Sequence, residues 1–209
     1  MSQLFNLDGP LLKFLSRSVD LVILNFLFLL FCIPIITIGA SMTALYSVLI
    51  KMVRDEEKYI VKSFILSFKR NFTQSTIVWV IMLGCALLLL TNLLFLGNLS
   101  GVLKIFFVSM LIIFVFIYLC ILLFIFPYMA RYEDNIKRSI LNSLLVGVFN
   151  LHYLVLLLIF TSFSVIVVFS SSIGFLSGLY FGTFGGFALI AFFYSYIFRK
   201  AFSKYEVRN

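Results

Sequence analysis

The sequence predicts an all-α fold, a polytopic transmembrane helical bundle. Of its 209 residues, 63% are hydrophobic and only 11% are charged, whereas soluble domains are about half apolar and a quarter charged. The apolar residues form continuous runs of roughly twenty, the length with which an α-helix crosses a bilayer. The strands of a membrane β-barrel would instead alternate in polarity over about ten residues. We therefore expect one membrane domain, residues 1–209, surrounded by the lipid bilayer.

The apolar runs predict about five spans: residues 19–38, 76–97, 104–129, 149–170 and 174–198. The first run is ambiguous, because Pro34 interrupts it and the run then resumes to about residue 50. Proline lacks a backbone N–H and kinks or ends a helix. The run is therefore either one span followed by a shorter helix at the membrane surface, or a helical hairpin that raises the count to six. Each arm of a hairpin would be about fifteen residues, which is short for a span.

Between the first two runs, residues 57–73 have the pattern of an amphipathic helix. Apolar residues recur at every fourth position, from Ile60 to Phe72, and basic residues occupy other positions. We expect this helix on the cytoplasmic side, either lying on the inner leaflet or docking in a groove of a partner. Its candidate contact face comprises Phe64, Phe68, Asn71 and Phe72.

Basic residues are distributed unevenly between the loops. The formal net charge is +8, and with five spans all 16 Lys and Arg residues except Lys13, Arg17 and Lys104 fall on one side. Because basic loops stay in the cytoplasm, we expect a multi-pass cell-membrane protein with a cytoplasmic C-terminus. The hairpin alternative would place Lys13 and Arg17 on the cytoplasmic side as well. Nucleic acid is not an expected partner, because the sequence contains no basic, aromatic soluble domain.

Small residues form a stripe on the last run. Gly174, Gly178 and Gly182 are spaced four apart, and Gly185 and Gly186 follow. Such a stripe lets another helix backbone approach closely. It indicates either a contact face for another protein or packing within the bundle.

The sequence offers few groups for catalysis. It contains no phosphate-binding loop, no Ser-His-acid set and no cluster with metal-ligand spacing, and it has a single histidine, His152. Asp20, at the start of the first run, either marks an ion path or pairs with Arg17. We expect no enzyme activity, no cofactor and no metal.

Four short motifs follow one another along the chain: Asp20 with Asn25, Pro34 to Ala40 with Thr43 to Tyr46, Ser67 to Phe72 with Trp79, and Phe126 to Tyr132. Their order and spacing resemble the YesL family of small bacterial membrane proteins, also called domain of unknown function 624. The resemblance extends over nearly the whole chain and is strongest over residues 1–80. The candidate family-motif residues are Asp20, Asn25, Pro34, Thr37, Gly39, Ala40 and Thr43.

The resemblance implies an association rather than a reaction. The family is bacterial, its activity is unassigned, and its genes often lie beside those of carbohydrate ABC importers of the oligosaccharide type. This implies an accessory or regulatory subunit without chemistry of its own, with the importer's permease subunits as partners. The coupling-loop pattern of the permeases themselves, Glu-Ala-Ala followed by a spaced Gly and a Leu-Pro, is missing from the sequence.

Two other functions stay open at this point. One is a small stand-alone membrane transporter or channel, whose path would use the polar residues Thr37, Ser41 and Thr43 at a broken helix. The other is a membrane assembly factor or sensor that reads its partner through residues 57–73.

Overall fold

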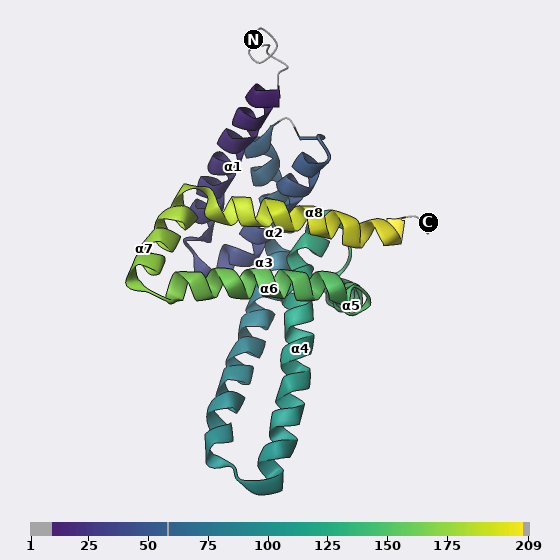
Figure 1. The fold of residues 1–209 in the computed structure, drawn as a ribbon. Helices are drawn as coiled ribbons and strands as arrows, with labels where there is room; N and C mark the ends of the chain where they lie inside the picture. The colour runs from purple at the N-terminus through teal and green to yellow at the C-terminus, as the bar shows by residue number, and fades with distance from the viewer. Residues whose placement is uncertain (1–9, 58, 207–209) are drawn as a thin grey trace.

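The computed structural model describes residues 10–57 and 59–206, and over these residues its regular structure is entirely helical (Figure 1). The helices are α1 (Pro10–Cys32), α2 (Ile38–Val53), α3 (Ile60–Phe95), α4 (Gly101–Arg131), α5 (Ile136–Phe149), α6 (Leu151–Phe169), α7 (Ser172–Phe181) and α8 (Phe187–Glu206). Three short segments join them: Ile35–Thr37, Leu96–Asn98 and Gly182–Gly186. In the described part of the chain, six helical stretches are long and apolar enough to cross a membrane. The predicted all-α membrane fold is confirmed.

The first apolar run is two helices, so the expectation of one span over residues 19–38 is wrong. Helix α1 ends at Cys32 and α2 begins at Ile38. Pro34 has extended dihedral angles and disfavours helix in the residue before it. The Thr37 hydroxyl donates to the carbonyls of Phe31, at 2.6 Å, and Pro34, at 2.7 Å, and so closes the turn. The length objection to a hairpin fails because α1 already begins at Pro10.

The expected amphipathic helix over residues 57–73 is also not a separate element. It is the first half of α3, a continuous helix of 36 residues, about 54 Å long at 1.5 Å per residue. No proline or glycine interrupts the sequence from Ile60 to Leu83, so nothing ends the helix there. The helix α5, which the sequence analysis did not single out, then follows α4 after four residues, 132–135.

The last apolar run, expected as one span over residues 174–198, contains a break. Helix α7 ends at Phe181, and the backbone leaves helical geometry at Gly185, whose φ is 154°. Side-chain-bearing residues rarely adopt this φ, so glycine permits the break. Helix α8 then continues from Phe187.

Helix α2 lies at the centre of the packed part and contacts α1, α3, α4 and α8. Thirteen of its 16 residues are buried. Its closest approach to α3 is at Gly39, where an added Cβ would lie 2.5 Å from the Ser75 carbonyl oxygen and 2.6 Å from the Trp79 Cβ. Beside this point the hydroxyls of Thr43 and Ser75 are 2.9 Å apart.

Helices α3 and α4 continue beyond the packed part as a long hairpin, seen projecting at the bottom of Figure 1. The Trp79 indole N–H donates to the Ile35 carbonyl at 2.9 Å, which places the α1–α2 turn beside Trp79. From Trp79 to its end at Phe95, α3 continues for 16 residues, about 24 Å. Between Met82 and Cys120 no described side chain is buried. We call residues 83–119 the distal hairpin.

Candidate functional site

Asn25 on α1 connects the first family motif to the broken last run. Its side chain is fully buried. The amide nitrogen donates to the carbonyls of Gly182, at 2.8 Å, and Thr183, at 2.9 Å. Its amide oxygen accepts a hydrogen bond from the backbone N–H of Ala188 at 3.1 Å. One side chain therefore pairs with three main-chain groups at the break between α7 and α8.

This arrangement explains why the break is tolerated. Backbone groups that leave a helix inside a membrane need other partners, because lipid offers no hydrogen bonds. Asn25 supplies them, and we call this arrangement the Asn25 clamp. Asp20, the other residue of this motif, is half-buried and lines cavities near the start of α1 instead. The structure therefore does not bring Asp20 and Asn25 into one site.

The glycine stripe packs largely against its own chain. A Cβ on Gly178 would lie 2.6 Å from the Val168 side chain of α6, and one on Gly174 would collide with the Val167 carbonyl. A Cβ on Gly182 would lie 3.0 Å from the Phe187 ring, and one on Gly186 would meet Phe181. These contacts favour the packing interpretation of the stripe. Gly185 supplies the positive φ. An apolar groove of about 680 Å³ runs along α6, α7 and the start of α8 and includes four of the five glycines in its lining.

The family-motif residues of α2 lie in the α2–α3 contact. Ala40 and Thr43 are fully buried, and Thr43 also donates to the Gly39 carbonyl at 3.0 Å. Pro34 and Thr37 form the preceding turn. In the described structure these residues serve the α1–α2–α3 packing.

The candidate amphipathic face is divided between the core and the surface. Phe64 is fully buried, Phe68 is partly buried, and both rings pack on Phe31 of α1 with centroids 5.6 and 4.6 Å away. Asn71 is buried and donates to the Ser67 carbonyl at 3.0 Å. Phe72 is exposed. The buried members of this face are therefore already covered by this chain.

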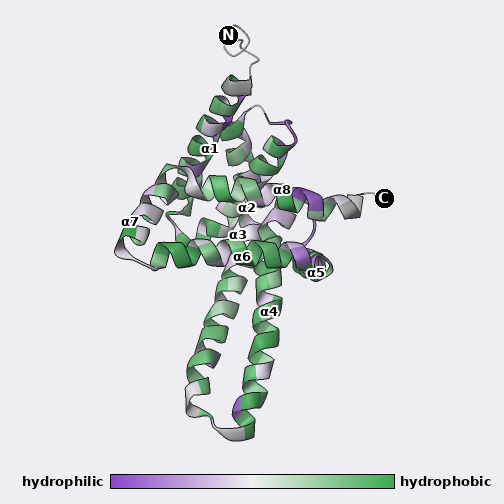
Figure 2. Ribbon diagram, in the orientation of Figure 1, coloured by the Kyte–Doolittle hydropathy of each residue, from purple (hydrophilic) through white to green (hydrophobic). Residues whose placement is uncertain are grey.

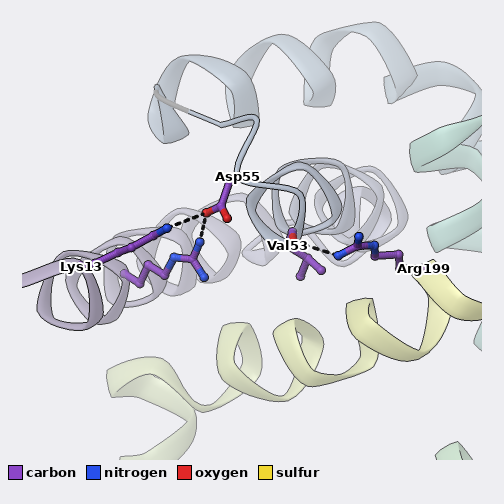
Figure 3. Close-up of polar contacts among 5 residues, drawn as sticks. Lys13, Val53, Asp55 and Arg199 are labelled. Atoms are coloured by element: carbon purple, nitrogen blue, oxygen red, sulfur yellow. Dashed lines mark hydrogen bonds and ion pairs between the residues drawn. The ribbon is translucent and has the colours of Figure 1, made fainter. Parts of the chain in front are cut away.

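Charged residues from distant parts of the sequence meet at one end of the molecule. Lys13 lies 3.5 Å from the Asp55 carboxylate, and Arg17 contacts the same carboxylate. Arg199 donates to the Val53 carbonyl at 3.3 Å. Figure 3 shows these three contacts beside the end of α2. The start of α1, the α2–α3 turn and the second half of α8 therefore lie together, and we call this the basic end.

The α4–α5 turn joins the same end. Arg70 of α3 and Glu133 of the turn form an ion pair at 2.9 Å, and Arg131 lines a cavity together with Arg54 and Arg199. Figure 2 shows hydrophilic colouring at the α2–α3 turn, around α5 and toward the C-terminal end of α8, while the distal hairpin is mostly hydrophobic. Among the described lysines and arginines, Lys104 lies apart from this end, near the α3–α4 turn.

Two cavities at the basic end differ in charge. The larger one, about 680 Å³, is lined by two basic residues, Lys13 and Arg17, and three acidic ones, Asp20, Asp55 and Glu57. The smaller one, about 420 Å³, is lined by Arg54, Arg131 and Arg199 with Glu56 and Ser203. The sequence analysis missed this second group, because its arginines lie at the ends of α2 and α4 and within α8 and share no motif.

No group of three or more His, Cys, Asp or Glu residues suited to a metal ion occurs among the described residues. His152 lies beside Tyr153, with ring centroids 3.9 Å apart. The expectations of no enzyme activity and no cofactor stay predictions.

Residues 21–93 match a family model described as protein of unknown function, DUF624. The matched segment contains α2, about half of α1 and nearly all of α3. It covers the second and third motifs of the sequence analysis and Asn25 of the first, whereas Asp20 lies just before it. No curated protein and no solved structure matches the chain. The family match confirms, over residues 21–93, the resemblance to the DUF624 family that the motifs predicted.

Proposed function

We propose that this chain is an accessory membrane subunit of a bacterial carbohydrate ABC importer, with no chemistry of its own. The resemblance stated above supports the choice of the importer as partner. The observation that carries the proposal is the distal hairpin, in which no described side chain is buried. We place the basic end, with the C-terminus, in the cytoplasm of the bacterial cell, because basic segments are retained there.

The distal hairpin is mostly apolar, and large apolar side chains are exposed on both of its arms (Figure 2). Leu94 on its first arm is 77% exposed and Val102 on its second arm is 83% exposed. Helix α1 carries Lys13, Arg17 and Asp20 in its first half, so its uncharged part, residues 21–32, is only about 18 Å long and does not fill the roughly 30 Å hydrocarbon core. The distal hairpin continues past the α1–α2 turn (Figure 1) and would occupy the remaining depth of the membrane without cover from α1 or α2. Other membrane helices can pack on its exposed side chains in place of lipid.

Affinity purification in mild detergent tests this proposal. A tagged chain should co-purify with the permease subunits of a sugar importer. The pair Leu94→Trp and Val102→Trp adds bulk that fluid lipid accepts and a packed protein contact resists, so it should reduce the recovered permease. Ile159→Trp is the matched control, because Ile159 is 63% exposed on α6. Absence of any importer permease from the purified material would sink the proposal.

The stand-alone transporter is the main alternative, and the broken last run is the feature that favours it. However, the Asn25 clamp already occupies the main-chain groups of that break. Ser41 and Thr43 are fully buried, and both donate to carbonyls of their own segment at 3.0 Å. These contacts argue against a polar path through Ser41 and Thr43. If liposomes that contain only the purified chain take up sugar or ions, the stand-alone transporter is the correct function and the importer subunit is not.

The assembly-factor alternative has a separate readout. If the chain assists assembly, its deletion lowers the abundance of the importer but leaves the transport rate per importer intact. An accessory subunit of the working complex lowers the rate per importer instead. Quantifying the permease in membranes alongside sugar uptake separates the two roles.

A further inference from the structure

The smaller cavity at the basic end concentrates positive charge. Arg54 comes from the end of α2, Arg131 from the end of α4 and Arg199 from α8, and Glu56 is the acidic residue in the lining. The lining therefore carries a formal charge of +2, from three arginines and one glutamate. The neighbouring larger cavity, with two basic and three acidic residues, carries −1. Positive charge is thus gathered in one of the two cavities.

Two of the three arginines are held by contacts outside the cavity. The Arg131 guanidinium carbon lies 5.8 Å from the Tyr132 ring centre and 5.6 Å from that of Phe202. Those two rings meet edge to face at 5.8 Å, so they form an aromatic cradle. Arg199 is tied to the end of α2 by its hydrogen bond to the Val53 carbonyl. Side chains that are already ordered lose less entropy when a ligand binds.

The chemistry of this group suits one class of ligand. A guanidinium presents its N–H donors as a planar fork that matches the oxygen atoms of a phosphate. Ser203 adds a hydroxyl at the same cavity. Basic pockets between membrane helices on the cytoplasmic side are positioned to receive the head groups of anionic lipids. We propose that Arg54, Arg131 and Arg199 form a binding site for a phosphate group. This proposal is independent of the importer.

Thermal unfolding of the purified full chain in detergent tests the site. The probes are phosphatidylglycerol, phosphatidylcholine and inorganic phosphate, each at the same ionic strength. The wild-type Tm should rise with phosphatidylglycerol or inorganic phosphate and not with phosphatidylcholine. Arg54→Gln and Arg199→Gln should each weaken the apparent affinity for the stabilising anion about tenfold, the effect of losing one charged hydrogen bond. Each variant is compared with its own ligand-free Tm, so a change in basal stability does not affect the result.

Lys137→Gln and Arg138→Gln are matched controls, because both residues are exposed on α5 and lie outside the cavity. They remove the same charge and should leave the affinity within about twofold of wild type. Stabilisation by phosphatidylglycerol alone identifies a lipid head group as the ligand, and stabilisation by inorganic phosphate identifies a soluble phosphate compound. No stabilisation by either anion, or an equal loss in the control variants, would overturn the proposal.

Discussion

Replacing Asn25 by alanine should lower the free energy of unfolding by about 2–5 kcal/mol. The substitution removes two donated hydrogen bonds and one accepted hydrogen bond at a fully buried position. Hydrogen bonds between membrane helices contribute about 0.6 kcal/mol on average and up to about 1.7 kcal/mol each, and three of them give the stated range. The substitution would leave the carbonyls of Gly182 and Thr183 and the N–H of Ala188 without the partner that Asn25 supplies.

Equilibrium unfolding in mixed micelles with increasing dodecyl sulfate measures this change. Asn92→Ala is the matched control, because Asn92 is exposed and its amide donates to the Leu88 carbonyl of its own helix at 2.9 Å. The control should change stability by less than about 0.5 kcal/mol. Asn25→Asp keeps the shape but replaces the donating amide with a carboxylate that faces two carbonyls, so it should be at least as destabilising as Asn25→Ala. Equal stabilities for the Asn25→Ala and Asn92→Ala variants would refute the Asn25 clamp.

Three further substitutions, with Gly84→Ala as a control, test the packing and the basic end by the same unfolding assay. Gly39→Ala should lower the free energy of unfolding by about 1–3 kcal/mol, because the added Cβ would clash with α3. Gly84→Ala should be neutral or stabilising, because nothing lies within 4 Å of its added Cβ. Equal effects of the two substitutions would contradict the close approach of α2 and α3 at Gly39. Gly185→Ala should cost about 1–3 kcal/mol, because φ is 154° there, and a neutral result would argue against the break. Asp55→Asn should lower the free energy of unfolding by no more than about 1 kcal/mol, and this effect should disappear at high salt. A loss of stability that does not depend on salt would show that the exposed ion pairs of Asp55 do not cause it.

Local properties of the sequence were sufficient to predict the helical membrane class. Hydropathy identifies apolar runs of spanning length, and Pro34 marks the division between α1 and α2. The number of helices was harder, because the choice depended on where α1 begins, and helix starts are set partly by tertiary contacts. The charge pattern did favour dividing the first apolar run into two helices, because that arrangement brings Lys13 and Arg17 to the same side as the other basic residues.

The candidate site was less predictable, because its partners are distant along the chain. Asn25 belongs to a motif, but its hydrogen-bond partners lie 157, 158 and 163 residues away. The glycine stripe was visible, yet only the position of α6 shows that Gly174 and Gly178 pack within the chain. The fourfold spacing that includes Phe64 is typical of a helix face that lies on a membrane. The same spacing also occurs in a face that another helix covers, as α1 covers Phe64. A periodic pattern identifies a buried face without identifying what covers it.

Photocrosslinking in living cells tests most directly whether the distal hairpin binds another membrane protein. A photoreactive amino acid at Leu94 or Val102, and at Ile159 as the control, reports what lies next to each position. The proposed function predicts an adduct with an importer permease from the hairpin positions and none from Ile159. Adducts with lipid alone at Leu94 and Val102 would contradict it.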